Sequence, residues 1–174
     1  MFTKKLYWYY LVMVAGLAAG ASLPAEAVTL SVESKSGASG TSVSVPVKVD
    51  QASGIGGYQF NIAFDPAILS CTAVQKGTLT NNSSWNLTPN IDNTGGTVFV
   101  SGMDMSFTGL SSGSGSLAIL VFTITGSPGQ ISPLSFNGGD CYLFDTMGGD
   151  IAFTTTNGQV TVAAPPSPTI AKST

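Results

Sequence analysis

The sequence predicts an all-β protein, a β-sandwich of about nine short strands. Several segments alternate apolar with polar residues, which is the period of a strand with one buried face. Turn-forming Gly, Pro, Asn and Ser residues separate these segments at short intervals. No segment has the period of an amphipathic helix. Together these observations favour two packed sheets over any helical or mixed architecture.

The alternation is clearest in two segments. Residues 43–49 place four valines on one phase, and residues 58–64 place Tyr58, Phe60 and Ile62 on one phase before an Asp-Pro turn. We expect these apolar phases to face the core. The segments with strand character are, in chain order, 28–33, 43–49, 58–64, 68–74, 97–103, 117–124, 131–136, 141–144 and 159–162.

The composition excludes several classes of function. The chain has 174 residues, with six Lys and Arg residues, nine Asp and Glu residues and no histidine. Without histidine there is no Ser-His-Asp triad, and the commonest zinc ligand is missing. A net charge of −3 argues against nucleic acid as a partner. We therefore expect a non-catalytic module with no cofactor and no catalytic residue.

Both ends of the chain differ from the middle. Residues 1–27 have a basic N-terminal region, then an apolar stretch, and then the small residues Ala25 and Ala27 of a candidate cleavage site. This order is typical of a secretory signal peptide. An uncleaved anchor is the alternative, although the apolar run is short for a membrane span. We expect cleavage before Val28, a secreted or cell-surface product, and no membrane span in the mature chain. Residues 164–174 are Pro-rich and predict a tail or linker.

The two cysteines, Cys71 and Cys141, both fall in the part expected to be exported. Cysteines in an oxidising compartment usually pair, so the sequence predicts a disulfide between them.

Several segments together resemble the cohesin domain, over residues 28–163. They read VTLSV at 28–32, SVPVKV at 44–49, IGGYQFNIAFDPAIL at 55–69, GSLAILVFTI at 115–124 and GQVTV at 158–162. The resemblance implies a nine-stranded jelly-roll sandwich, similar to cellulose-binding modules. It also implies a receptor for a dockerin-bearing protein, which would tether polysaccharide-degrading or surface proteins.

The resemblance places the dockerin-binding face on the strand near residues 57–64. If its aromatic phase faces the core, Gln59, Asn61 and Ala63 point outward. Type I cohesins carry an Asn and an Asp early in this strand, and the matching positions here are Gly57 and Gln59. The sequence therefore departs from the type I pattern at both positions.

The strand at 97–103 is expected to lie beside the strand near residues 57–64. Its phase decides whether Ser101 or Val100 joins the predicted binding face.

Two other readings of the polar and aromatic residues remain open. Asp140, Asp145 and Asp150 offer oxygen ligands to calcium, but their spacing favours turn capping and no metal site is predicted. Aromatic rings suit sugar faces, so a structural or adhesive module that binds polysaccharide directly is the alternative function. The rings considered for this platform are those of Tyr58, Trp85, Phe107 and Tyr142.

Overall fold

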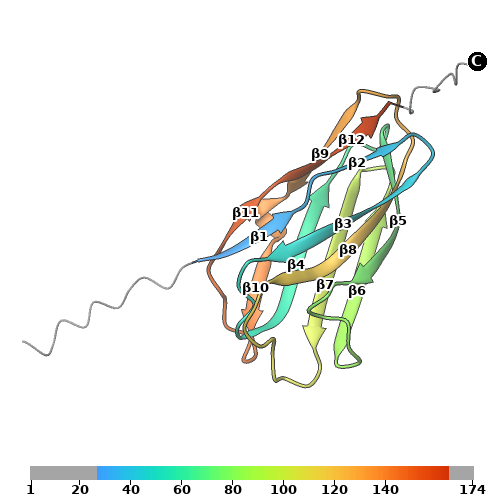
Figure 1. Cartoon of the computed structure of the whole chain (residues 1–174). Coiled ribbons are helices and arrows are strands. Elements are labelled where there is room, and N and C mark those ends of the chain that lie inside the picture. Colours follow the sequence, from blue (N-terminus) through green and yellow to red (C-terminus); the bar gives the residue numbers. More distant parts are fainter. Residues whose placement is uncertain (1–26, 165–174) are drawn as a thin grey trace, which may run out of the picture.

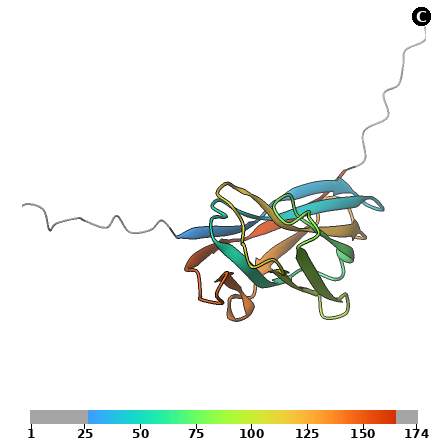
Figure 2. The ribbon, with the colours of Figure 1, turned by 90° about the horizontal axis from the view of Figure 1, so that it is seen from below.

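The computed structural model describes residues 27–164, which form twelve strands in two sheets packed face to face (Figure 1). The view along the sandwich shows the two layers (Figure 2). The all-β sandwich expected from the sequence is confirmed. The expected signal peptide, except Ala27, and the Pro-rich tail, except Ala164, lie outside the described residues.

The first sheet has five strands. Within it, β8 lies between β3 and β5 and pairs antiparallel with both. Its strands in spatial order are β11 (Phe153–Thr156), β1 (Val28–Val32), β3 (Ser42–Val49), β8 (Gly115–Ile124) and β5 (Leu69–Lys76).

The second sheet has seven strands, and β4 is its longest member. Six strands lie in the order β2 (Lys35–Ala38), β12 (Gly158–Ala163), β9 (Ile131–Phe136), β4 (Ile55–Ala63), β7 (Thr97–Asp104) and β6 (Trp85–Asp92). The seventh, β10 (Tyr142–Asp145), pairs with β4 and follows the short 3-10 helix η1 (Gly138–Asp140). Residues 27–164 contain no helix with the length and apolar character that a membrane crossing needs.

The structure adds three strands to the nine that the sequence predicts: β2, β6 and β11. All three lie at an edge of a sheet. Edge strands are mostly exposed, so alternation is weak there, and β6 also carries Pro89 in its middle. For these reasons the sequence does not predict the strand at Trp85–Asp92.

The core lies between the sheets, and the inward phase of β4 is at its centre. Tyr58, Phe60 and Ile62 are buried, as the alternation predicts. Ring centroids of Tyr58 and Trp85 lie 5.7 Å apart in a stacked arrangement. The Tyr58 hydroxyl donates to the Leu117 carbonyl across the sandwich at 2.9 Å. This bond satisfies the only polar atom of a buried ring, as a low-dielectric interior requires.

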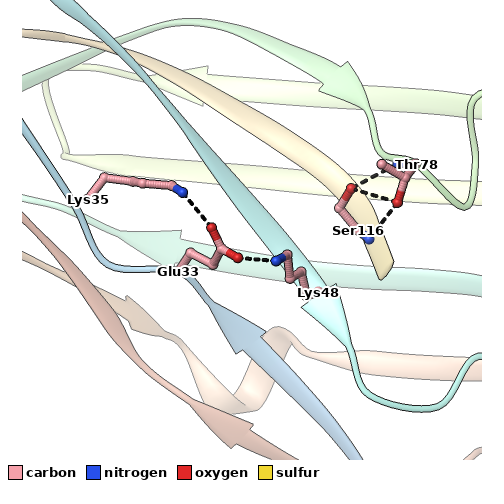
Figure 3. A network of polar contacts seen from close by, with 5 residues as sticks. All are labelled: Glu33, Lys35, Lys48, Thr78 and Ser116. Carbon is pink, nitrogen blue, oxygen red and sulfur yellow. Dashed lines mark hydrogen bonds and ion pairs between the residues drawn. The ribbon is translucent and has the colours of Figure 1, made fainter. Parts of the chain in front are cut away.

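The chain crosses between the sheets near Glu33, from β1 to β2. The Glu33 carboxylate pairs with Lys35 at 2.6 Å and also with Lys48 on β3 (Figure 3). These two lysines hold the pKa of Glu33 below its ordinary value. At the start of β8, where Ser116 pairs with Lys48 of β3, the Ser116 hydroxyl donates to the Thr78 hydroxyl at 3.3 Å (Figure 3). Both polar contacts fasten loops to the five-stranded sheet.

The predicted disulfide is wrong, because both cysteines are free and buried. Cys71 lies on β5 in one sheet, and its thiol donates to the Ala73 carbonyl at 3.6 Å. Cys141 precedes β10 in the other sheet, and its thiol donates to the Asn137 carbonyl at 3.2 Å. Burial raises the pKa of Cys71 to about 11 and also raises the pKa of Cys141. Each cysteine therefore serves as a small core residue in its own sheet.

Candidate functional site

The outward phases of β10, β4, β7 and β6 form one open surface, named here the β4–β7 face. The register places Gln59 between Tyr142 of β10 and Ser101 of β7. The next outward row contains Phe144, Gly57 and Met103 in the same way. The face therefore has an ordered grid of side chains that no other strand of residues 27–164 covers.

The structure brings together the residues that the sequence selects for binding. Gln59 and Asn61 are half-buried and Ala63 is exposed, all on the outward phase of β4. Ser101 joins the face, whereas Val100 points inward and is fully buried. Gly57 lies on the same phase but is buried at the base of a depression.

One end of the β4–β7 face contains polar residues, and a hydrogen bond joins it to η1. The Asn61 side-chain amide donates to a carboxylate oxygen of Asp140 at 3.2 Å, and the Asn137 amide donates to the same oxygen at 3.1 Å. The Asn61 Oδ1 atom is buried without a hydrogen-bond partner among residues 27–164. Beyond it, Ala63 pairs with Thr97 of β7. This end therefore combines the small Ala63, the half-buried Phe99 that pairs with Asn61, and the carboxylate of Asp140.

The other end is an apolar groove of about 510 Å³. Gly57 forms part of its floor, where the missing side chain leaves space. Met103 and Phe144 line it from the neighbouring strands, and Phe107 and Met147 line it from loops. Phe107 is 62% exposed and Met147 is 96% exposed. The predicted dockerin-binding face includes only Gly57 among these five residues, and Phe107 is considered only as a ring of the alternative sugar platform.

A buried carboxylate holds the loop that carries Phe107. Asp104, at the end of β7, is 2% exposed and accepts hydrogen bonds from the backbone N–H groups of Ser106, Thr108 and Gly109, at 2.8 to 3.1 Å. The Ser106 hydroxyl donates to it as well, at 2.7 Å. Burial raises the pKa of Asp104, but these donors outweigh that effect and hold the pKa well below its ordinary value.

Within this loop, Phe107 is the only non-glycine residue of the described chain with a positive φ, at 57°. A left-handed conformation is unfavourable for a residue with a side chain, and the surrounding bonds must maintain it. The Phe107 N–H donates to the Asp104 carbonyl at 3.2 Å, which closes the turn. The position of the Phe107 ring at the groove is thus set by Asp104.

The opposite wall of the groove is a turn capped by Asp145. Its carboxylate accepts from the backbone N–H groups of Met147 and Gly149, both at 2.8 Å. Asp145 therefore caps its turn, as the sequence indicates, whereas Asp140 accepts from the two side-chain amides described above. Residues 27–164 contain no group of three acidic, Cys or His side chains placed to hold a metal ion.

The four aromatic residues considered as a sugar platform do not share a surface. Tyr58 and Trp85 are stacked in the core, at 2% and 3% exposure. Tyr142 is exposed and stacks on Phe144 instead, with ring centroids 5.8 Å apart. Phe107 lies across the groove on a loop. These four rings therefore do not form the platform considered as the alternative, because Tyr58 and Trp85 are part of the core.

The fold and the face agree with one family. The cohesin-domain family matches the chain over residues 28–162. This chain belongs to the cohesin family. The match spans nearly all of residues 27–164, and the family expected from the sequence is confirmed. A search among curated protein sequences finds no significant match.

Solved structures of other cohesins are similar to this cohesin. The CaCohA2 protein of Clostridium acetobutylicum has 28% identity and a TM-score of 0.68, and the match covers 79% of this chain and 92% of that one. The sixth cohesin of scaffoldin B from Acetivibrio cellulolyticus, solved in complex with a Cel5 dockerin, has 25% identity and a TM-score of 0.68, covering 78% and 99%. A non-cellulosomal cohesin of the archaeon Archaeoglobus fulgidus has 24% identity and a TM-score of 0.68, covering 79% and 92%, and shows the fold alone.

Proposed function

We propose that this chain is a secreted, non-catalytic cohesin module that binds a dockerin-bearing protein through the β4–β7 face. The observation that carries the proposal is the family match over residues 28–162, joined to the complex between a dockerin and the similar Acetivibrio cohesin. Binding would tether polysaccharide-degrading or surface proteins to whatever carries the module. The predicted signal peptide at 1–27 supports secretion.

The geometry of the face supports docking of a folded partner. The backbone groups of β4 and β7 are paired within the sheet, so a partner meets side chains and not free N–H or C=O groups. We propose Gly57, Gln59, Asn61, Ala63 and Ser101 as contact residues. Gly57 and Gln59 replace the Asn and Asp of the type I pattern, so we expect a different set of dockerins from that of ordinary type I cohesins.

A binding titration tests the function. Residues 28–174 are immobilised and exposed to a panel of purified dockerin modules, and the free module is separately mixed with insoluble cellulose and with insoluble chitin. We expect at least one dockerin to bind and the module to stay in the supernatant over both polysaccharides. Retention on polysaccharide with no dockerin binding would replace the proposal by the adhesive alternative.

A charge substitution then locates the site. Ala63→Arg places a bulky cation on the exposed part of the face and should weaken dockerin binding by at least about tenfold. Ser44→Arg, at an exposed position of β3 in the opposite sheet, is the matched control and should bind as wild type. Equal affinities for both variants would move the site away from the β4–β7 face.

A further inference from the structure

The exposed apolar side chains of the molecule gather at one place. Among the six large hydrophobic residues that are most exposed, Met103, Phe107 and Met147 line the groove described above. Tyr142 stacks on the groove residue Phe144, and Met105 lies in the loop of Phe107. A cluster of this kind on a soluble domain marks an interaction surface, because water-exposed apolar area is unfavourable unless a partner covers it.

The groove is formed before any partner arrives. Asp104 holds Phe107 in a left-handed conformation that the residue would not adopt by itself. Asp145 fixes the turn of Met147 on the other side. Strained backbone maintained by surrounding bonds is concentrated at functional sites, and a rigid pocket lowers the entropic cost of binding.

The floor of the groove has free space because Gly57 has no side chain. A Cβ atom built on Gly57 would lie 3.4 Å from the Gly102 carbonyl oxygen and 3.7 Å from the Phe144 ring, which are ordinary contacts. The fold therefore tolerates a side chain at this position, and its absence leaves room between Met103 and Phe144. The hollow can hold one side chain of a partner.

The charges around the groove are all negative. Asp145 lines the groove, and the backbone of Asp150 forms an isolated antiparallel β-bridge with the groove residue Phe144. The lysines of residues 27–164 lie elsewhere: Lys35 and Lys48 pair with Glu33, and Lys76 donates to the Asn82 carbonyl at 2.8 Å. A cationic group beside the groove would therefore meet complementary charge.

The partner segment is expected to be a helix. A strand would bind at a sheet edge, yet residues 149–151 bond to the outer edge of β10, and Pro89 interrupts the exposed edge of β6. A helix packs on a sheet face without needing free backbone groups.

We propose that the groove receives one bulky apolar side chain from a partner helix, with a Lys or Arg one turn away, and that this contact contributes more binding energy than the polar row at Asn61 and Ala63. The proposal rests on the proposed function, since the partner is taken to be a dockerin module. It adds which residues select the partner: Gly57, Met103, Phe107, Phe144 and Met147. Asp104 acts as a positioning residue for Phe107.

The test selects dockerin modules from a displayed library in which the exposed helix positions are randomised. Residues 28–174 serve as the bait. We expect the selected modules to share Leu, Ile, Met or Phe at one position, with Lys or Arg three or four positions away. Their affinity should fall at least about tenfold for Gly57→Val and for Met147→Ser. Ile131→Ala, which truncates an exposed apolar residue outside the groove, is the control and should bind as wild type.

The outcomes separate the two proposals. Selected dockerins that lose binding to Ala63→Arg but bind the groove variants as wild type would overturn this inference and leave the proposed function intact. Selected modules with small or acidic residues in place of the apolar anchor would overturn it equally. A library that yields no dockerin for the wild type would remove the proposed function and this inference with it. Met147→Ser keeps the test valid even if Gly57→Val alters folding, because Met147 is 96% exposed.

Discussion

The two phases of β4 and β7 differ sharply although they alternate residue by residue along the same strands. The inward phase is continuous apolar packing, with Phe60 and Val100 fully buried at paired positions. The outward phase mixes amides, small residues, a glycine and the half-buried Phe99, and it becomes exposed and apolar at Met103. The inward phase determines whether the domain folds, and the outward phase determines what the domain meets.

The difference shows how one sheet can keep its fold while its recognition changes. A packed interior penalises any change of volume, whereas an exposed position tolerates substitution when no hydrogen bond depends on it. Substitutions in the two phases should therefore separate stability from binding. The largest expected effects lie on the inward phase.

Phe60→Ala should lower the free energy of unfolding by about 3–5 kcal/mol, because it opens a cavity at the centre of the core. Gln59→Ala, one residue away on the outward phase, should change it by less than about 0.5 kcal/mol. Urea titration of both variants measures the difference. Similar losses in the two would contradict the assigned phases.

Two glycines provide a second comparison across the sheet. A Cβ atom on Gly102 would overlap the ring of Tyr58, whose hydroxyl is fixed by the Leu117 carbonyl. Gly102→Ala should therefore cost about 1–3 kcal/mol of stability. Gly57→Ala meets only ordinary contacts and should leave the melting temperature nearly unchanged. A larger loss for Gly57→Ala than for Gly102→Ala would reverse the comparison.

Asp104 joins the two phases, because it is buried yet shapes the exposed loop. Asp104→Asn replaces a carboxylate by an amide that cannot accept from every donor in the loop, and should cost about 1–3 kcal/mol. Asp145→Asn, an exposed cap across the groove, should cost less. Thermal melts at neutral pH compare the two.

The pH dependence of stability provides an independent check on Asp104. The pKa of this group is lowered in the folded protein, so its contribution is fully present above the unfolded-state pKa of about 3.9 and is lost as pH falls further. Wild type should lose stability below about pH 4 more steeply than Asp104→Asn, which does not titrate there. Parallel curves for the two proteins would show that the carboxylate is not stabilised by folding.

The sequence predicted the phases of β4, because a strand with one buried face carries its own period of two. It left the choice between Ser101 and Val100 open, and the register of β7 decides it. It missed β6, whose exposed edge and Pro89 conceal that period. It missed the groove because Phe107 and Met147 lie on loops that only the tertiary fold brings together. The Asp-x-Ser-x-Thr-Gly pattern at 104–109 is a local turn signal that could have identified one wall.

The prediction of a disulfide was wrong because it, too, depended on the tertiary fold. Export conditions favour pairing of cysteines that meet, but they do not bring Cys71 and Cys141 together from opposite sheets.

Only a small net effect on stability is expected at Phe107. Glycine adopts a positive φ without strain, so Phe107→Gly removes the cost of the left-handed backbone and gives up little packing from a ring that is 62% exposed. Against this, glycine gains conformational freedom in the unfolded chain, and the net change should be within about 1 kcal/mol. Calorimetric melting of Phe107→Gly and wild type measures it. A marked loss of stability would show that the ring packs as part of the core and does not serve primarily as a wall of the groove.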